Sequence, residues 1–125
     1  MIVGVGIDIV DVSRIERLLK QYGGQFAGRI LCGTEREGFD ASTRQAWFLA
    51  NRFAAKEALS KALGTGLRYP VTLQAISVTN DSLGKPMFGF HGPLPQYLAS
   101  RGVRHSHLGL SHEKGMACAM VVLEQ

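Results

Sequence analysis

The chain has 125 residues, a net charge of +4 and an apolar content of 46%, as expected for one small globular domain. No apolar run approaches the roughly 20 residues that span a bilayer, and the first residues lack the basic region of a secretory signal. Cys32 and Cys118 lie far apart without metal-binding spacing, so we expect reduced thiols in a cytoplasmic protein. The mildly basic charge suits an anionic ligand or an acidic partner.

Valine and isoleucine dominate residues 2–10, which predicts a strand. Because both of its faces are apolar or small, we expect this strand to be central in its sheet. Ser13 and Glu16 have the spacing of a capping box ahead of two leucines. Residues 12–22 are therefore predicted to form a short helix that ends at Gly23-Gly24. Residues 25–40 show only weak helical turns.

Residues 42–63 carry the longest helical pattern, since small and apolar side chains recur near the 3.6-residue period. Gly64 and Gly66 are expected to end this helix. Strands are predicted at 73–79 and 87–90, with a brief helix at 93–101. Residues 105–111 and 116–123 are predicted to form a final hairpin. No linker or repeat interrupts the pattern, so residues 1–125 are expected to be a single domain.

Three side chains on these elements could carry chemistry. Asp8 lies inside an apolar strand, where a carboxylate costs several kcal/mol unless it is paired, hydrogen-bonded or metal-bound. Gly4 and Gly6 share its face and leave room for something to approach. Glu57 and Lys61 are four residues apart on the long helix, hence about 6 Å apart along its axis.

That spacing would let Glu57 hold a cation while Lys61 holds a phosphoryl oxygen of the same diphosphate. An ordinary solvated Glu–Lys pair has the same spacing. Likewise, Asp8 could accept backbone N–H bonds or pair with an arginine. Together, Asp8 and Glu57 would be two hard oxygen ligands of the kind that Mg²⁺ takes beside substrate phosphates and water. The residues alone leave these alternatives open.

Residues 4–16, 51–66 and 80–88, in that order, closely resemble the holo-acyl-carrier-protein synthase family, as does the final segment 108–124. The central F-x-x-K-E-A-x-x-K-A pattern is similar to the whole phosphopantetheinyl transferase superfamily. The N-terminal GIDIV and the chain length point to its small, single-domain branch. The resemblance implies an α+β fold, with a mostly antiparallel sheet packed against one long helix plus short helices.

The resemblance also implies a reaction. The 4'-phosphopantetheine arm of coenzyme A is transferred to a serine of an apo acyl carrier protein, adenosine 3',5'-bisphosphate leaves, and fatty acid biosynthesis is supported. Asp8 and Glu57 would be the Mg²⁺ ligands, and Lys61 would neutralise the transferring phosphate. The serine proton would pass to Glu57 or to a water held by the metal. Residues expected to bind coenzyme A are Arg52, Lys56, Gly64, Thr65, Gly66, Lys85, Pro86, Ser111 and His112.

Basic residues recur at three-residue steps on the first helix, at Arg14, Arg17 and Lys20. The resemblance implies that Arg14 docks the acidic carrier protein, and charge alone extends this expectation to Arg17 and Lys20. A solvated helix face would show the same pattern. The small branch resembles homotrimers whose active sites are shared between neighbouring subunits.

Other functions fit the sequence less well. A non-catalytic coenzyme A or nucleotide-binding module would need the basic loops but not Asp8 together with Glu57. A trimer without activity is disfavoured by the intact motifs. Nucleic acid and membrane are not expected as partners, because the chain has no basic run. His105 and His107 alternate on one strand face but lack a further donor at zinc spacing, so no zinc site is expected.

Overall fold

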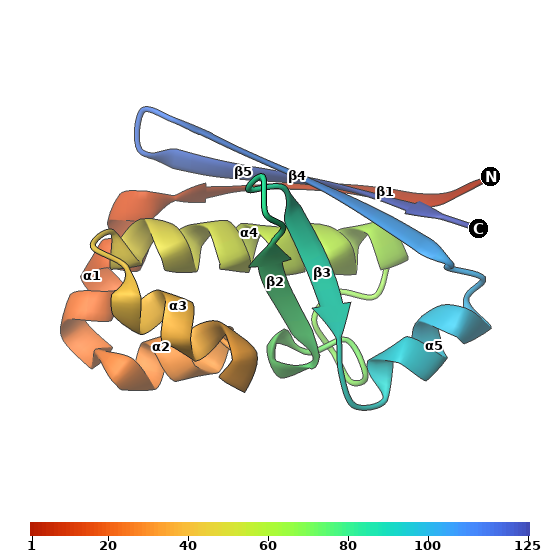
Figure 1. The fold of residues 1–125 in the computed structure, drawn as a ribbon, viewed down its shortest axis with the longest axis horizontal. Helices are drawn as coiled ribbons and strands as arrows, with labels where there is room; N and C mark the ends of the chain where they lie inside the picture. The colour runs from red at the N-terminus through yellow and green to blue at the C-terminus, as the bar shows by residue number, and fades with distance from the viewer.

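Helix α4 (Gln45–Leu63) runs through the middle of the molecule in the computed structural model, which describes all 125 residues (Figure 1). The strands β1 (Ile2–Asp11), β4 (His105–Glu113) and β5 (Met116–Glu124) form a sheet along one side of this helix. The remaining elements pack around its other sides and are α1 (Val12–Tyr22), α2 (Gly24–Ile30), the 3-10 turn η1 (Gly33–Glu35), α3 (Arg36–Ala41), the 3-10 turn η2 (Leu73–Ala75), β2 (Ile76–Asn80), β3 (Pro86–Phe90) and α5 (Leu94–Ser100). The predicted α+β fold, with antiparallel strands against one long helix, is confirmed.

Alanine makes α4 a helix that neighbours can approach from several sides. Ala50, Ala54 and Ala58 follow one stripe of the helix at four-residue steps, Ala55 lies to one side of it, and all four are wholly buried. The helix ends as predicted at Gly64, whose positive φ of 75° gives a left-handed cap. It begins at residue 45 rather than at 42, because Ser42 is extended and Arg44 is not helical. None of the helices combines the length and the hydropathy that crossing a bilayer requires.

The large sheet is antiparallel in the order β1-β5-β4. Strand β1 is therefore an edge strand of this chain, and the prediction that it is central was wrong. The two apolar faces of β1 have different surroundings. One face packs on α4, while the other, with Val3, Val5, Ile7 and Ile9, is exposed.

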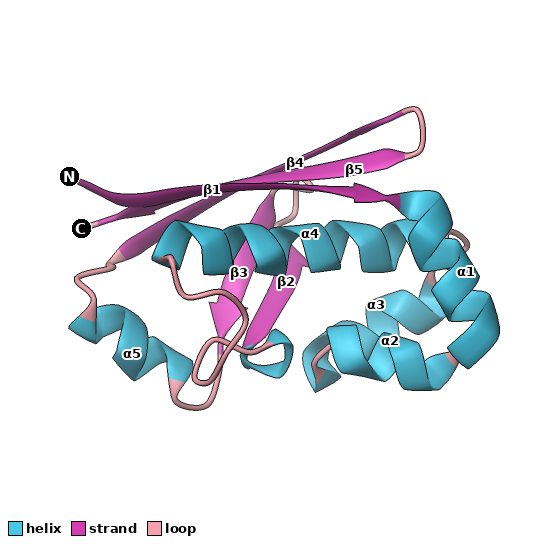
Figure 2. Cartoon of the chain, turned by 180° about the vertical axis from the view of Figure 1, so that it is seen from behind, coloured by secondary structure: helices cyan, strands magenta, loops and turns pink.

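Two glycines bring β1 directly onto α4 (Figure 2). A Cβ on Gly4 would collide with the carbonyl oxygen of Ala62, and one on Gly6 would collide with that of Ala58. Two strand residues span about 6.6 Å and four helix residues about 6 Å, so the two elements stay in step. The next residue on this face, Asp8, is thereby directed toward the preceding part of α4.

The final hairpin is confirmed, with strands slightly longer than predicted. Glu113 pairs with Met116, so the turn consists of Lys114 and Gly115 alone. Both turn residues have positive φ, 50° and 77°, as a two-residue hairpin turn of the I' kind requires.

Three local predictions need correction. The N-cap of α1 is Asp11, whose carboxylate accepts the Ser13 backbone N–H at 2.9 Å, so Ser13 lies inside the helix and no Ser13–Glu16 capping box forms. The ambiguous residues 25–40 contribute to α2, η1 and α3. In the predicted strand 73–79, residues 73–75 form η2, and the strand begins only at Ile76.

Candidate active site

Asp8 of β1 and Lys61 of α4 form an ion pair, with Lys61 Nζ 2.9 Å from Asp8 Oδ1. Side chains on a helix lean toward its N-terminus, which lets Lys61 reach back to Asp8 beyond the glycine contact. The hydrogen bond to Asp8 and the charge of that carboxylate raise the pKa of Lys61. Lys61 is therefore a cation at neutral pH, and its exposed side chain is accessible to an anionic ligand.

Glu57 lies near this pair, one helical turn before Lys61. Burial raises the pKa of Glu57, the neighbouring Asp8 carboxylate raises it further, and Lys61 opposes both effects. The charge of Asp8 therefore disfavours the charged form of Glu57, and a cation bound in the cavity that both residues line would relieve that repulsion.

A cavity of about 480 Å³ lies between β1, α1 and α4 and contains both acidic side chains. Its lining also includes Arg14, the residue predicted to dock a carrier protein. The full lining is Asp8, Ile9, Val10, Asp11, Arg14, Phe53, Glu57 and Met116. The structure thus brings the first helix, the first strand and the long helix together around one open site.

The donor set of this cavity fits Mg²⁺. No three His, Cys, Asp or Glu side chains cluster anywhere in the chain in a way that could hold a metal. Mg²⁺ is nevertheless commonly bound by one or two carboxylates, with substrate phosphates and water completing the shell. Asp8 and Glu57 supply two such carboxylates, and the cation Lys61 already neutralises one of them. The arrangement suits an enzyme that transfers a phosphoryl-linked group.

Lys56 does not fit its predicted role as a ligand of coenzyme A. Its side chain is 0% exposed, and Nζ donates to Ile30 O, Glu35 Oε1 and Leu73 O at 2.6, 2.6 and 3.1 Å. These acceptors use all three ammonium protons inside the fold. Lys56 has no free donor for a phosphate, so the role that the resemblance implied for it was wrong.

Arg52 is also directed away from the Asp8–Glu57 cavity. Its guanidinium lies 3.7 Å from the centroid of the Phe48 ring, and its Nε lies 3.8 Å from Glu35 Oε2. Burial lowers the pKa of Arg52, and the charge of Glu35 opposes this shift. The structure assigns Arg52 to the buried group around Glu35, while its contact with coenzyme A remains an untested prediction.

Glu35 is a buried acid that the sequence reasoning missed. It is 3% exposed and accepts backbone N–H groups from Cys32 and Val78 at 3.0 and 2.9 Å. It lies in the segment 25–40, whose helical signal was weak. The only sign of it in the sequence is its place shortly after the apolar residues Ile30 and Leu31.

The other residues predicted to bind coenzyme A do not line the Asp8–Glu57 cavity of this chain. Gly64, Thr65 and Gly66 form the turn after α4. Lys85 and Pro86 line a separate cavity of about 310 Å³ between the turn preceding β3 and strand β4.

Ser111 and His112 lie near the tip of the final hairpin. They line a cavity of about 430 Å³ that shares Ile9 and Met116 with the Asp8–Glu57 cavity. The imidazole of His112 packs edge-on against Trp47 of α4, with ring centroids 4.9 Å apart. Of the predicted coenzyme A residues outside α4, this pair therefore lies next to the acidic site.

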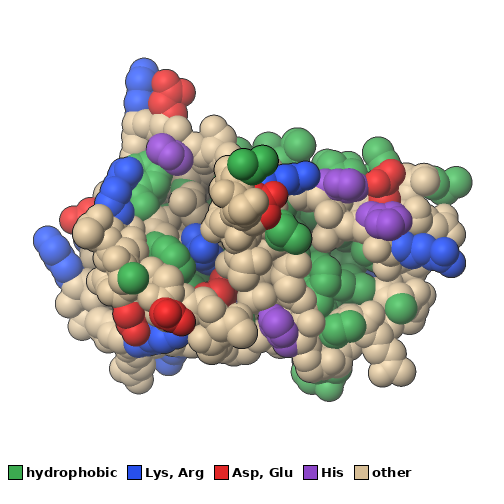
Figure 3. Space-filling model, in the orientation of Figure 1, with side chains coloured by type: hydrophobic (Ala, Val, Ile, Leu, Met, Phe, Trp, Pro, Cys, Tyr) green, Lys and Arg blue, Asp and Glu red, His purple; other side chains and the backbone are tan.

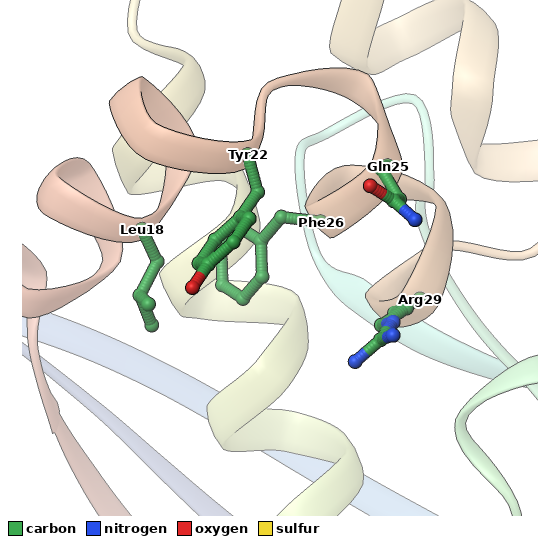
Figure 4. A pocket seen from close by; sticks show the side chains of 5 residues that line it. All are labelled: Leu18, Tyr22, Gln25, Phe26 and Arg29. Atoms are coloured by element: carbon green, nitrogen blue, oxygen red, sulfur yellow. The ribbon is translucent and has the colours of Figure 1, made fainter.

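The basic residues predicted to dock a partner are exposed along α1, at Arg14, Arg17 and Lys20. Beside them, α1 and α2 enclose a cavity of about 420 Å³ that sequence reasoning missed. The rings of Tyr22 and Phe26 lie between Leu18 and Arg29 in this cavity (Figure 4). Its lining is Leu18, Tyr22, Gln25, Phe26 and Arg29.

Comparison with known proteins agrees with this geometry. The family model of the 4'-phosphopantetheinyl transferase superfamily matches residues 4–121. The holo-acyl-carrier-protein synthase of Nitrosospira multiformis is 51% identical over 125 residues, which cover 100% of both chains. The chain belongs to the 4'-phosphopantetheinyl transferase superfamily.

Solved structures show the same fold. The holo-acyl-carrier-protein synthase of Neisseria meningitidis has a TM-score of 0.96 and 43% identity, and the match covers 100% of both chains. The Bacillus anthracis synthase, described in complex with CoA (3',5'-ADP), has a TM-score of 0.82 and 42% identity. That match covers 98% of this chain and 96% of the other.

Proposed function

We propose that this chain is a holo-acyl-carrier-protein synthase. It transfers 4'-phosphopantetheine from coenzyme A to a serine of an apo acyl carrier protein, releases adenosine 3',5'-bisphosphate and supports fatty acid biosynthesis. The observation that carries the proposal is the single cavity lined by Asp8 and Glu57, with Lys61 paired to Asp8. Full-length relatives with this activity in their names, and the coenzyme A complexes of the Bacillus anthracis and Helicobacter pylori synthases, support it. The proposal treats residues 1–125 as one transferase domain.

We further propose that the enzyme depends on Mg²⁺ held by Asp8 and Glu57. The ion would supply charge neutralisation on the diphosphate of coenzyme A. Lys61 donates to the same diphosphate and stabilises the charge that develops on the leaving phosphate. The step needs alignment of the serine hydroxyl with the β-phosphorus more than covalent help from the protein. The cavity wall, which includes Ile9 and Phe53, would restrict how the serine hydroxyl and the diphosphate lie relative to each other.

The transfer itself is tested by mass spectrometry of an apo acyl carrier protein incubated with the enzyme, coenzyme A and Mg²⁺. Transfer of one phosphopantetheine adds about 340 Da to the carrier and leaves adenosine 3',5'-bisphosphate in solution. A carrier mass that stays unchanged while coenzyme A still binds would identify a binding module instead. The two free cysteines support a cytoplasmic site of action.

The acidic carrier protein is proposed to dock on α1. Arg14 lies in the catalytic cavity, while Arg17 and Lys20 line a shallow groove on the same helix. Arg17 and Lys20 extend the basic surface from Arg14 along α1, while the cavity of Tyr22 and Phe26 shares no residue with their groove. An acidic helix that carries the acceptor serine could contact the basic side chains.

Charge reversal at Arg14 is expected to weaken this docking. The Arg14→Glu variant should raise the KM for the carrier protein about tenfold, because a repulsive charge replaces an attractive one beside the acceptor serine. The KM for coenzyme A should stay within about twofold of wild type. Steady-state kinetics with each substrate varied checks both values, and Arg104→Glu, an exposed position before β4, is the matched control. An unchanged carrier KM would remove Arg14 from the docking surface.

We also propose a homotrimer with active sites at the subunit interfaces. The support is the outer face of the large sheet, where Val5, Ile7, Ile9 and Met120 are exposed side by side on β1 and β5. Apolar side chains gather over this edge of the molecule (Figure 3). A contiguous apolar face on an edge strand is unfavourable in water unless another chain covers it.

A charge on that face should break the assembly. Ile7 is 61% exposed in the single chain, so Ile7→Lys costs the isolated fold little while placing an ammonium group in the proposed interface. Analytical ultracentrifugation is expected to show wild-type trimers and Ile7→Lys monomers at micromolar concentration. Leu83→Lys, at an exposed turn position outside the sheet, should remain trimeric. Identical sedimentation of all three proteins would exclude this face as the interface.

A further inference from the structure

Lys56 is the largest wholly buried side chain of the molecule, although its neighbour Glu57 lines the catalytic cavity. Its ammonium donates to the last carbonyl of α2 at Ile30, to Glu35, and to the first carbonyl of η2 at Leu73. Taking a lysine out of water is costly unless each charge and donor is matched. Here the charge faces a carboxylate and all three ammonium protons have acceptors, so the burial of Lys56 is fully compensated.

Glu35 extends the connections of this pair. Its Oε1 accepts hydrogen bonds from Lys56 Nζ and from the Cys32 backbone N–H, and its Oε2 accepts one from the Val78 backbone N–H of β2. Arg52 of α4 faces Oε2 as well. One buried ion pair thus joins α4 to α2, η1, η2 and β2, segments that lie far apart in the sequence.

Stability alone does not explain why these positions are charged, since well-packed apolar residues can replace a buried ion pair without loss. Directional bonds, by contrast, fix the rotation of a helix. Along β1, α4 is contacted through the backbone at Gly4 and Gly6, which meet the carbonyl oxygens of Ala62 and Ala58. Buried leucines at 49, 59 and 63 also hold α4 in the core, but apolar contacts are non-directional, whereas the hydrogen bonds of Lys56 are directional.

Rotation of α4 would move Glu57 relative to Asp8 on β1. Side-chain groups lie about 5–6 Å from a helix axis, so a rotation of about 10° moves such a group by about 1 Å. A misplacement of about 1 Å can slow a reaction by about 10²-fold. Lys56 precedes Glu57 by one residue and lies about 100° away around the helix. Fixing the direction of the Lys56 side chain therefore also fixes where the Glu57 carboxylate lies.

We propose that Lys56 and Glu35 are positioning residues for transfer: their buried ion pair sets the rotation of α4 and so aligns Glu57 with Asp8. The inference rests on the catalytic role proposed above for Glu57. Neither Lys56 nor Glu35 touches a substrate.

The test separates positioning from stability by replacing both partners at once. In Lys56→Met alone the melting temperature should fall strongly, because Glu35 loses its closest cation in the interior and keeps only the more distant Arg52. The double variant Glu35→Gln/Lys56→Met should recover part of that loss, because both charges are gone while the Gln oxygen can still accept a backbone N–H group. Its kcat should nevertheless remain at least about tenfold below wild type, with KM for coenzyme A and for carrier protein within about threefold. Leu98→Ala, a core truncation in α5 away from the pair, should lose stability but keep its kcat.

A double variant with wild-type kcat would show that the pair only stabilises the fold. A raised KM for coenzyme A at unchanged kcat would place the pair in substrate binding, which also overturns the proposal. If the double variant fails to fold, Glu35→Gln keeps the volume and the acceptor but removes the charge. A folded Glu35→Gln protein with wild-type kcat would then be decisive against positioning. Failure of the catalytic assignment itself is distinguished by Glu57→Gln, which would retain turnover.

Discussion

Glu57→Gln is expected to reduce phosphopantetheine transfer by about 10²- to 10³-fold, because it removes one of two carboxylates that hold the cation on the diphosphate. The substitution preserves the shape of the side chain, so the melting temperature should change little. Asp8→Asn should have a similar effect and also weakens the bond to Lys61. Transfer rates measured over a Mg²⁺ titration check this. Glu113→Gln, an exposed acid at the hairpin turn, is the control.

The pH dependence of the same reaction is a second test of whether Glu57 binds the metal. A carboxylate binds a cation only when it is deprotonated, and burial together with Asp8 raises the pKa of Glu57. Its protonation therefore begins at a higher pH than for an ordinary glutamate. At limiting Mg²⁺, transfer should fall as the pH drops toward that raised pKa, and additional Mg²⁺ should restore it. Near-normal turnover in Glu57→Gln, or a pH profile that Mg²⁺ leaves unaltered, would contradict the metal assignment.

Gly6→Ala is expected to cost the fold about 3 kcal/mol or more, a fall in melting temperature on the order of 10 °C. A methyl group at this position would lie inside contact distance of the Ala58 carbonyl oxygen and close to the Ala62 backbone nitrogen. Both obstacles are helix backbone, which cannot turn aside as a flexible side chain does. Strand β1 would have to lift from α4 and would carry Asp8 away from Lys61 and Glu57.

The matched control is Gly33→Ala in η1, outside the large sheet. Its φ is not in the left-handed region, and a Cβ there would meet nothing within 4 Å. Thermal unfolding of both variants should show the wild-type transition for Gly33→Ala and a markedly lower one for Gly6→Ala. The remaining folded fraction of Gly6→Ala should also transfer slowly. Equal stability of the two variants would mean that β1 does not rest on α4 through Gly6.

Sequence spacing was a good guide to what lies along one element. It placed Glu57 and Lys61 on one stripe of a helix, and the structure directs both toward Asp8. The family resemblance, by contrast, implied a wrong role for Lys56, and spacing could not have corrected it. A helical period tells which residues are neighbours on the surface of the helix, but not which stripe faces water. Because lysine is rarely buried, exposure was the natural expectation, and only the acid at Glu35 makes burial possible.

The glycines on β1 also show what the sequence predicted and what only the structure revealed. Gly4 and Gly6 predicted a close approach on the Asp8 face, but not that the approaching group is the backbone of α4. The apolar composition of β1 predicted two covered faces. The structure covers one face with α4 and leaves the other exposed, and it places the strand at the edge of its sheet in the order β1-β5-β4.

Local sequence by itself determined the long helix and its glycine cap, the final hairpin without the exact length of its turn, and the family motifs. These features depend on backbone preferences and on residues a few positions apart. The tertiary structure alone decided that Lys56 is internal, that Glu35 is its partner, and that the Asp8 and Glu57 carboxylates share a cavity. The pairs Lys56–Glu35 and Lys61–Asp8 join residues 21 and 53 positions apart, and the energy of such pairs depends on burial, which a linear pattern does not contain.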